Sequence, residues 1–242
     1  MNLEERFKAA FIPPRLQLRW LVARERARGE RELALVPRLA RRDRVSLDIG
    51  ANRGVWSEVM RRHSAAVHAF EPNPKMFREL ARAAGPGVTV HRIALSDRSG
   101  TAELLVPRGT RGYSNQGASL SAGKIGAAEH RAVTVEARRL DDLDLGEIGF
   151  IKIDVEGHEL AVIEGARETL RRCRPNLIVE IQEVHAGRPI GEALAAVCAH
   201  GYAAFALDGG ELRPVAEIDL PARHGPGIPR DRYLFNWVFL PA

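Results

Sequence analysis

Short apolar segments alternate with segments of helical periodicity along the chain from residue 44 onward. This alternation is typical of α/β proteins, in which helices cover both faces of a mostly parallel sheet. We therefore predict a doubly wound α/β fold, and we expect the last apolar segment, which follows no helical segment, to join the sheet as an antiparallel strand. The expected strands are 45–49, 67–70, 88–95, 99–106, 132–139, 150–155, 177–181, 202–207 and 233–240, and the expected helices are 54–63, 74–84, 157–172 and 190–200.

The segment that precedes this pattern, residues 1–43, has the pattern of one or two amphipathic helices interrupted at Pro13-Pro14 and at Pro37. A chain of 242 residues is long enough for one large core. We therefore expect a helical arm at 1–43 in front of a single domain at 44–242. The helices of the arm offer a surface through which a homo-oligomer could form.

The positive charge of the chain is concentrated in its N-terminal part. The net charge is +5, and residues 1–44 hold twelve Lys or Arg against six Asp or Glu. Such a segment could contact nucleic acid, an anionic membrane surface or an acidic partner. Its positive and negative residues are interspersed and aromatic residues are few, which favours a solvent-exposed helix face with local ion pairs. We therefore expect no nucleic-acid partner.

The sequence also bears on location and on cysteine chemistry. No apolar stretch approaches the roughly 18 residues of a membrane span, and the segment from Met1 to Arg6 lacks the apolar part of a signal peptide. We therefore expect a cytoplasmic protein without a membrane span. Only two cysteines are present, which excludes a multi-disulfide scaffold and a multi-cysteine zinc site.

A glycine turn follows the first expected strand and precedes the first helix of the domain. It contains Gly50 and Gly54, and glycine lets the backbone approach a ligand closely. Glu71 ends the next strand, twenty-one residues after Gly50. An acidic residue at this position of an α/β sheet can bind both ribose hydroxyls of a nucleoside. The two features together predict a nucleoside-containing cofactor.

The spacing of the turn favours one cofactor over another. The turn lacks the middle glycine of G-x-G-x-x-G, which lets the pyrophosphate of a dinucleotide approach the backbone. S-adenosylmethionine has no phosphate and carries a sulfonium cation, so an acidic strand end such as Asp48 suits it better. Asp97 could then accept a hydrogen bond from the adenine amino group, although it could equally be a turn residue before Gly100.

Charged residues interrupt the apolar strand at 150–155. Lys152, Asp154 and Glu156 alternate with apolar residues and are expected to project in one row toward the carboxyl end of the strand. Ligands bind at this end of open α/β sheets. The structural alternative is that Lys152 neutralises a neighbouring carboxylate and that Glu156 caps the following helix.

The strand at 177–181 repeats this pattern. Glu180 and Gln182 share one face, and Glu180 is expected to face Asp154 across the mouth of a pocket. His158 and His185 are then candidate proton acceptors for an attacking hydroxyl.

Two irregular segments interrupt the strand–helix pattern. The first, residues 107–131, is rich in glycine, and the second, residues 221–230, is rich in proline and glycine. Long loops of this kind in compact domains are often lids or binding loops. We expect 107–131 to be a lid or an acceptor-binding loop.

These motifs resemble those of FkbM-type methyltransferases, which use S-adenosylmethionine and have a Rossmann-like, class I fold with a seven-stranded sheet. The resemblance covers about residues 44–240 and implies O-methylation of a sugar or a secondary metabolite. The matching segments are Asp48–Gly54 with Ser57, Phe70–Pro74, Ala94–Asp97, Ile151–Glu159, Gly165-Ala166, Arg174-Pro175 and Glu180.

The resemblance also implies roles for individual residues. Glu71 would hold the ribose and Asn73, from the same motif, would lie at the cofactor. Asp154 would lie beside the sulfonium and face the acceptor. The residues implied at the methionine end are Asp48, Gly50, Asn52 and Gly54, and those implied at the adenine are Ser96 and Asp97.

The expected reaction is an in-line displacement in which an acceptor hydroxyl of a small molecule or glycoside attacks the methyl group. Asp154 is the first candidate for the base, and Glu156, His158 and His185 are the others. A divalent metal shared by Asp154 and Glu180 could instead activate the hydroxyl, but direct base catalysis is favoured and no metal is expected. The competing hypotheses are an NAD(P)-linked oxidoreductase and a non-catalytic binding module.

Overall fold

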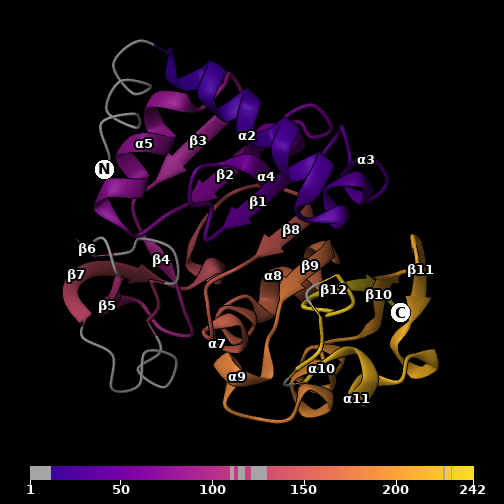
Figure 1. Cartoon of the computed structure of the whole chain (residues 1–242). Helices are drawn as coiled ribbons and strands as arrows, with labels where there is room; N and C mark the ends of the chain where they lie inside the picture. The colour runs from indigo at the N-terminus through magenta and orange to yellow at the C-terminus, as the bar shows by residue number, and fades with distance from the viewer. Residues whose placement is uncertain (1–11, 110–111, 114–117, 121–129, 226, 230) are drawn as a thin grey trace.

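The computed structural model describes residues 12–109, 112–113, 118–120, 130–225, 227–229 and 231–242. Its centre is an eight-stranded sheet in the order β11-β10-β12-β9-β8-β1-β2-β3 (Figure 1). The strands are β1 Val45–Ile49, β2 Ala66–Phe70, β3 Val88–His91, β8 Ile148–Ile153, β9 Asn176–Glu180, β10 Tyr202–Asp208, β11 Glu211–Pro214 and β12 Asn236–Pro241.

The pairing confirms the predicted doubly wound, mostly parallel sheet. Strands β3, β2, β1, β8 and β9 pair in parallel. The last strand, β12, pairs antiparallel with both β9 and β10, as predicted. An eighth strand that the sequence did not predict, β11, adds a hairpin to the edge strand β10.

Helices cover both faces of the sheet and bury two apolar clusters. On one face lie α2 Pro14–Arg28, α3 Val36–Leu39, α4 Val55–Met60 and α5 Pro74–Ala83, and on the other lie α7 Glu159–Glu164, α8 Arg167–Cys173 and α10 Ile190–Cys198 (Figure 1). Side chains alternate between these faces along β8, because successive residues of a strand point to opposite sides. Ile151 and Ile153 join one cluster and Phe150 joins the other.

The N-terminal segment packs against the domain. Helix α2 begins at Pro14, whose fixed φ suits the first helical turn. Leu18 and Val22 of α2 belong to the same buried cluster as Trp56 and Phe150. The described part of 1–43 is therefore built into one layer of the fold, while the division of the chain into an arm and a domain stays a prediction. The part of the chain that the structure describes contains no helix that could cross a membrane.

A second, smaller sheet lies beside the main one, in the order β4-β7-β5-β6. Its two long strands, β5 Gly100–Gly109 and β7 His130–Arg138, confirm the strands predicted at 99–106 and 132–139. The short strands are β4 Ala94–Leu95 and β6 Gly112–Tyr113. Much of the predicted loop 107–131 lies outside the described residues, so its role as a lid or acceptor loop stays a prediction.

Three predicted elements differ from the structure. The strand predicted at 88–95 is divided, because Ala94 and Leu95 pair with β7 of the second sheet instead of continuing β3. The helix predicted at 157–172 is divided into α7 and α8 at Gly165, where a Cβ atom would lie 1.9 Å from the carbonyl oxygen of Ser96. Strand β8 ends at Ile153, so the predicted row of three charges on one strand is wrong and only Lys152 lies on it.

Candidate active site

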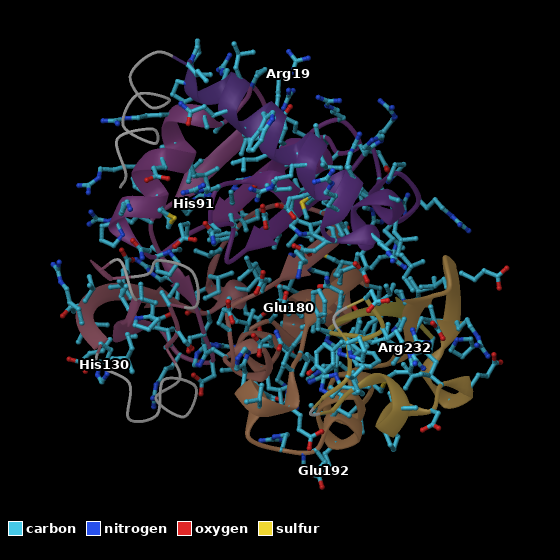
Figure 2. All side chains as sticks on the ribbon, viewed as in Figure 1. Arg19, His91, His130, Glu180, Glu192 and Arg232 are labelled. Carbon is cyan, nitrogen blue, oxygen red and sulfur yellow. The ribbon has the colours of Figure 1, made fainter. Side chains whose placement is uncertain are left out.

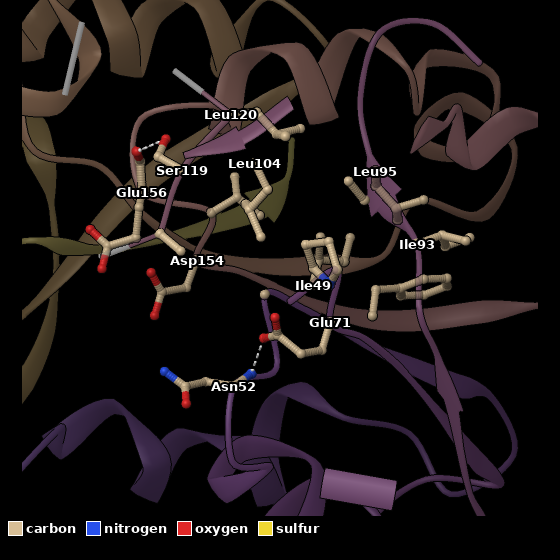
Figure 3. A pocket seen from close by; sticks show the side chains of 16 residues that line it. Ile49, Asn52, Glu71, Ile93, Leu95, Leu104, Ser119, Leu120, Asp154 and Glu156 are labelled. Carbon is tan, nitrogen blue, oxygen red and sulfur yellow. Dashed lines mark hydrogen bonds between the residues drawn. The ribbon is translucent and has the colours of Figure 1, made fainter. Parts of the chain in front are cut away.

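A cavity lies at the carboxyl ends of β1, β2 and β8, where an open α/β sheet binds its ligands (Figure 3). One wall carries Glu71 beside apolar side chains such as Ile93 and Leu95, and the opposite wall carries Asp154 and Glu156. The lining residues are Ile49, Gly50, Asn52, Phe70, Glu71, Pro72, Ile93, Ala94, Leu95, Leu104, Ala118, Ser119, Leu120, Asp154, Val155 and Glu156.

The glycine turn after β1 brings two strand ends together. Gly50 has φ +83°, and a Cβ atom at this position would lie 1.8 Å from the carbonyl oxygen of Asp154. Glycine is therefore required by the close approach of the β1 and β8 ends. Asn52 also has a positive φ, of 47°. Its backbone N–H donates a hydrogen bond of 2.8 Å to Oε2 of Glu71 (Figure 3).

Glu71 is held in a fixed orientation at the end of β2. Its second oxygen, Oε1, accepts a hydrogen bond of 2.8 Å from the backbone N–H of Asn73. The side chain is 7% exposed, and burial raises its pKa to about 7 although the two backbone hydrogen bonds lower it. The carboxylate thus faces the cavity with both oxygens anchored and with lone pairs left for a ligand hydroxyl.

Asp154 and Glu156 line the opposite side of the cavity, and Glu180 ends the neighbouring strand β9. Burial raises the pKa of Asp154 well above its usual value, and the nearby charges of Glu180 and Glu156 raise it further. Burial likewise raises the pKa of Glu180 to about 7, and Oε1 of Glu180 accepts a hydrogen bond of 2.7 Å from Gln182. Figure 2 shows Glu180 near the centre of the molecule. Because Ile153 of β8 pairs with Val179 of β9, Asp154 and Glu180 follow at adjacent strand ends. Glu180 is not among the residues that line the cavity, so its position across the mouth of a pocket stays a prediction.

The two predicted histidines lie in different surroundings. Nδ1 of His185, on α9 Glu183–Ala186, lies 3.6 Å from Oε2 of Glu156. Nε2 of His158 lies 2.8 Å from Oγ of Ser96. Because Ser96 donates its hydroxyl proton to Asp97 at 2.9 Å, His158 donates to Ser96. Burial lowers the pKa of His158, which favours its neutral form.

Ser96 and His158 line a second hollow, beside β5, that shares Leu120 with the first. Asp97 is exposed. The structure therefore groups Ser96, Asp97 and His158 together, next to the strand β4 that lines the cavity. Their roles as adenine contacts or base stay predictions.

Asp48, Gly54 and Asn73 were predicted to bind the cofactor, but they do not line the cavity. Their contacts join the strands and helices around it. Oδ2 of Asp48 accepts hydrogen bonds from the backbone N–H and the hydroxyl of Ser57, at 2.8 and 2.5 Å, and thereby ties β1 to α4. Gly54 packs against Leu80 of α5. Oδ1 of Asn73 accepts from the backbone N–H groups of residues 75 and 76 and caps α5. Direct contacts of these residues with a cofactor stay predictions.

Sequence reasoning missed the apolar wall and one polar contact. Ile93 and Leu95 from the β4 region and Leu104 from β5 face the cavity (Figure 3). The hydroxyl of Ser119 donates a hydrogen bond of 2.6 Å to the carbonyl oxygen of Glu156. Leu95 lies in the Ala94–Asp97 segment and Ser119 in the 107–131 segment that the sequence analysis singled out, but neither was assigned to the cavity, and no local pattern marked Ile93 or Leu104.

The charge of the lining defines which ligands fit. The charged residues of the lining are Glu71, Asp154 and Glu156, and none of the lining residues is basic. The carboxylates of the lining suit a ligand with hydroxyl groups and a positive charge, whereas a pyrophosphate has no basic partner among these residues. No group of three or more His, Cys, Asp or Glu side chains that could hold a metal ion occurs among the described residues.

The sheet order and the acidic end of β2 are those of a class I, Rossmann-like methyltransferase. A family model described as a methyltransferase FkbM domain matches residues 48–203. The chain therefore belongs to the FkbM methyltransferase family, which decides against the NAD(P)-linked alternative. A crystal structure of methyltransferase FkbM from Methylobacillus flagellatus matches the fold with a TM-score of 0.50 and 18% identity, over 81% of this chain and 43% of that chain.

Two curated relatives carry names that specify an acceptor or a position. Hexuronic acid methyltransferase AglP of Haloferax volcanii is 31% identical over 172 residues, which are 66% of this chain and 64% of the relative. The 2-O-methyltransferase NoeI of Sinorhizobium fredii is 32% identical over 159 residues, which are 58% of this chain and 64% of the relative. The match thus spans just under two thirds of the length of each relative.

Proposed function

We propose that this protein is an S-adenosylmethionine-dependent O-methyltransferase that acts on a hydroxyl of a sugar or another small molecule. The observation that carries the proposal is the position of Glu71 and Asp154 on one cavity. Glu71 presents an anchored carboxylate beside an apolar wall, and Asp154 presents a half-buried carboxylate on the other side. Family membership supports the same reaction.

The residues present fit the cofactor. Each oxygen of Glu71 already accepts one backbone N–H, so the ribose hydroxyls would meet an acceptor that needs no reorientation. Ile93 and Leu95 provide apolar surface for the adenine. When bound, S-adenosylmethionine supplies a methyl group activated by a sulfonium cation, and the acidic wall favours that cation.

The residues of the chain contribute orientation and a proton acceptor. Asp154 would accept the proton of an acceptor hydroxyl bound beside it, as the hydroxyl oxygen bonds to the methyl carbon and the bond from that carbon to sulfur breaks to leave the neutral thioether. Glu156 and His185 lie together at the same edge and are placed to bind other hydroxyls of the acceptor. Holding the two reactants in line supplies about 7–11 kcal/mol of the barrier reduction.

The acceptor class is proposed from the relatives and from the site. The relatives are named for a hexuronic acid and for 2-O-methylation. Several carboxylates and a histidine at one edge of the cavity suit a polyhydroxylated acceptor such as a glycoside, because each can bind a hydroxyl group.

A methyl-transfer assay tests the proposal. The protein is incubated with isotopically labelled S-adenosylmethionine and a panel of glycosides and hydroxylated metabolites, with and without a chelator. We expect labelled methyl ether from at least one acceptor and the same rate after chelation. Absence of S-adenosylhomocysteine binding in calorimetry, or a specific response to NAD, would overturn the proposal.

Three further expectations stay proposals. Helix α2 leaves Leu16 and Trp20 exposed, at 51% and 62%, and this surface supports homo-oligomer formation through the N-terminal helices. Size-exclusion chromatography with light scattering tests it against a Leu16→Ser, Trp20→Ser variant. Arg19 of α2 points away from the rest of the molecule, so α2 presents a basic side chain to solvent (Figure 2). The expectation that the chain binds no nucleic acid stays a prediction. The cytoplasmic location also stays a prediction.

A further inference from the structure

A lysine is buried directly behind the candidate active site. Lys152 is 0% exposed, and its side chain points into the layer that contains α2 and α4. Nζ donates hydrogen bonds to Oδ1 of Asn236 at 3.0 Å and to the carbonyl oxygen of Ile153 at 3.3 Å. It also lies 5.3 Å from the centroid of the Trp56 ring. A cation in such a place needs compensating charge, because burial without it is costly.

The compensating groups come from both ends of the chain. Nδ2 of Asn236, at the start of β12, donates a hydrogen bond of 3.1 Å to Oε2 of Glu30. The same oxygen of Glu30 accepts a hydrogen bond of 3.0 Å from Nε1 of Trp56. Glu30 follows α2 and Asn236 precedes the C-terminus, so both lie outside the residues 48–203 that match the family model.

This network is electrically coupled to the proposed base. Burial by itself would lower the pKa of Lys152, but the carboxylates around it raise the value above its usual range, with Asp154 acting most strongly and Glu30 next. Lys152 in turn favours the ionised form of Asp154. The charged groups that act on Asp154 or on Lys152 come from all the elements around them. They are Glu30 and Glu32 between α2 and α3, Asp48 on β1, Lys152 on β8, Glu156 after β8, Glu159 on α7 and Glu180 on β9. Oε2 of Glu32 also accepts a hydrogen bond of 3.5 Å from Nδ2 of Asn236.

We propose that Asn236 holds Lys152 in place beside Asp154 and that Glu30, held by Asn236 and Trp56, sets the charge around this pair, so that both are positioning residues of the methyl-transfer site, supplied by segments outside the matched domain. This inference rests on the function proposed above. A second hydrogen bond, of 2.8 Å from Nδ2 of Asn176 to the carbonyl oxygen of Leu39, ties the N-terminal segment to β9 without touching Lys152. The chain thus offers a control that separates attachment of this segment from its effect on the site.

The direction of each effect follows from the charges. Glu30→Gln removes a negative charge near Asp154 and keeps the acceptor oxygen for Asn236 and Trp56, so the pKa of Asp154 falls. Lys152→Met removes the positive charge at similar side-chain length, so the pKa of Asp154 rises, by about one pH unit or more. Asn176→Ala loosens the same segment and leaves this pKa unchanged.

The experiment follows the carboxyl resonance of Asp154 during a pH titration of the free full-length protein labelled with 13C-aspartate. The resonance is assigned by its loss in Asp154→Asn. The pH profile of methyl transfer is measured alongside it, and its acid limb is expected to move down in Glu30→Gln and up in Lys152→Met. Circular dichroism reports whether each variant folds. If Lys152→Met does not fold, the pKa of Asp154 in Glu30→Gln alone decides the outcome.

The outcomes separate the two proposals. An unchanged or raised Asp154 pKa in Glu30→Gln, or an equal shift in Asn176→Ala, overturns the positioning role even if methyl transfer is found. Opposite shifts of the Asp154 pKa in Glu30→Gln and Lys152→Met would support the charge network. If the same protein transferred no methyl group to any acceptor, that result would overturn the proposed function, and with it the catalytic role of the network.

Discussion

The two walls of the cavity hold their carboxylates, buried Glu71 and half-buried Asp154, in different ways. Both oxygens of Glu71 accept backbone N–H groups from the loops after β1 and β2. The carboxylate of Asp154 has no hydrogen-bond partner in the part of the chain that the structure describes, and Glu180, Glu156 and Lys152 act on it through their charges. The first wall is organised to bind a ligand in one orientation. The second keeps a basic oxygen available for chemistry, and its ionisation depends on the surrounding charges.

The largest expected effect is on the second wall. Asp154→Asn keeps the size of the side chain and removes its basicity, so turnover should fall by about 100- to 10,000-fold. Calorimetry with S-adenosylhomocysteine should show nearly unchanged binding, because the ribose-binding wall is intact. The control is Asp144→Asn, at an exposed carboxylate away from the cavity. Unchanged turnover in Asp154→Asn would show that the two walls do not divide binding and chemistry as described.

The next effect is on the first wall. Glu71→Ala removes the acceptor for the ribose hydroxyls and frees the N–H groups of Asn52 and Asn73, so cofactor affinity should fall by roughly 10- to 100-fold. Glu79→Ala, at a half-exposed carboxylate that pairs with Arg53 on the surface, serves as the matched control. Equal affinities for wild type and Glu71→Ala in calorimetry would contradict the assignment of the ribose to this wall.

Backbone geometry at the junction of the walls gives a third prediction. Gly50→Ala should lower the free energy of unfolding by about 2–3 kcal/mol or more, because a positive φ is strained for alanine and the new Cβ atom meets the Asp154 carbonyl oxygen. At Gly87 φ is also positive, +80°, but nothing lies within 4 Å of an added Cβ atom. Gly87→Ala should therefore cost only about 1 kcal/mol. Urea unfolding of both variants measures the difference, and equal costs would mean that the strand ends are not closely packed.

The pH dependence of stability gives the smallest effect. The pKa of Glu71 is raised to about 7 in the folded protein, so between pH 5.5 and 7.5 the folded state binds more protons than the unfolded state. Stability therefore falls as pH rises through this range, and Glu71 accounts for about 2 kcal/mol of the fall. Urea unfolding at both pH values should show a smaller fall in Glu71→Gln than in wild type. A fall of the same size would mean that Glu71 is ionised in the folded protein throughout.

The sequence was sufficient where function depends on local pattern. The strand–helix alternation predicted the sheet, and the spacing between Gly50 and Glu71 predicted that both residues lie at one cavity, because these patterns are local in sequence. The charge at Asp154 also marked a residue that lines the cavity, since the ends of adjacent parallel strands lie at one edge of the sheet. The binding of a ribose by Glu71 and the catalytic role of Asp154 and Glu180 stay predictions.

The sequence alone was insufficient to predict contacts between residues that are not neighbours in a local pattern. Asp48 was expected in the cavity, but its carboxylate is occupied by Ser57, nine positions along the chain. Lys152 bonds to Asn236, more than eighty residues away in sequence, and Glu30 bonds to Asn236 and to Trp56. The division of the strand predicted at 88–95 follows from pairing with β7. A single sequence contains no local signal for such pairings.

A crystal structure with S-adenosylhomocysteine tests the central claim most directly. We predict that the ribose hydroxyls lie within about 3 Å of the carboxylate oxygens of Glu71, that the adenine contacts Ile93 and Leu95, and that the sulfur lies on the Asp154 side. A ligand bound elsewhere on the chain, or a ribose that makes no contact with Glu71, would contradict it.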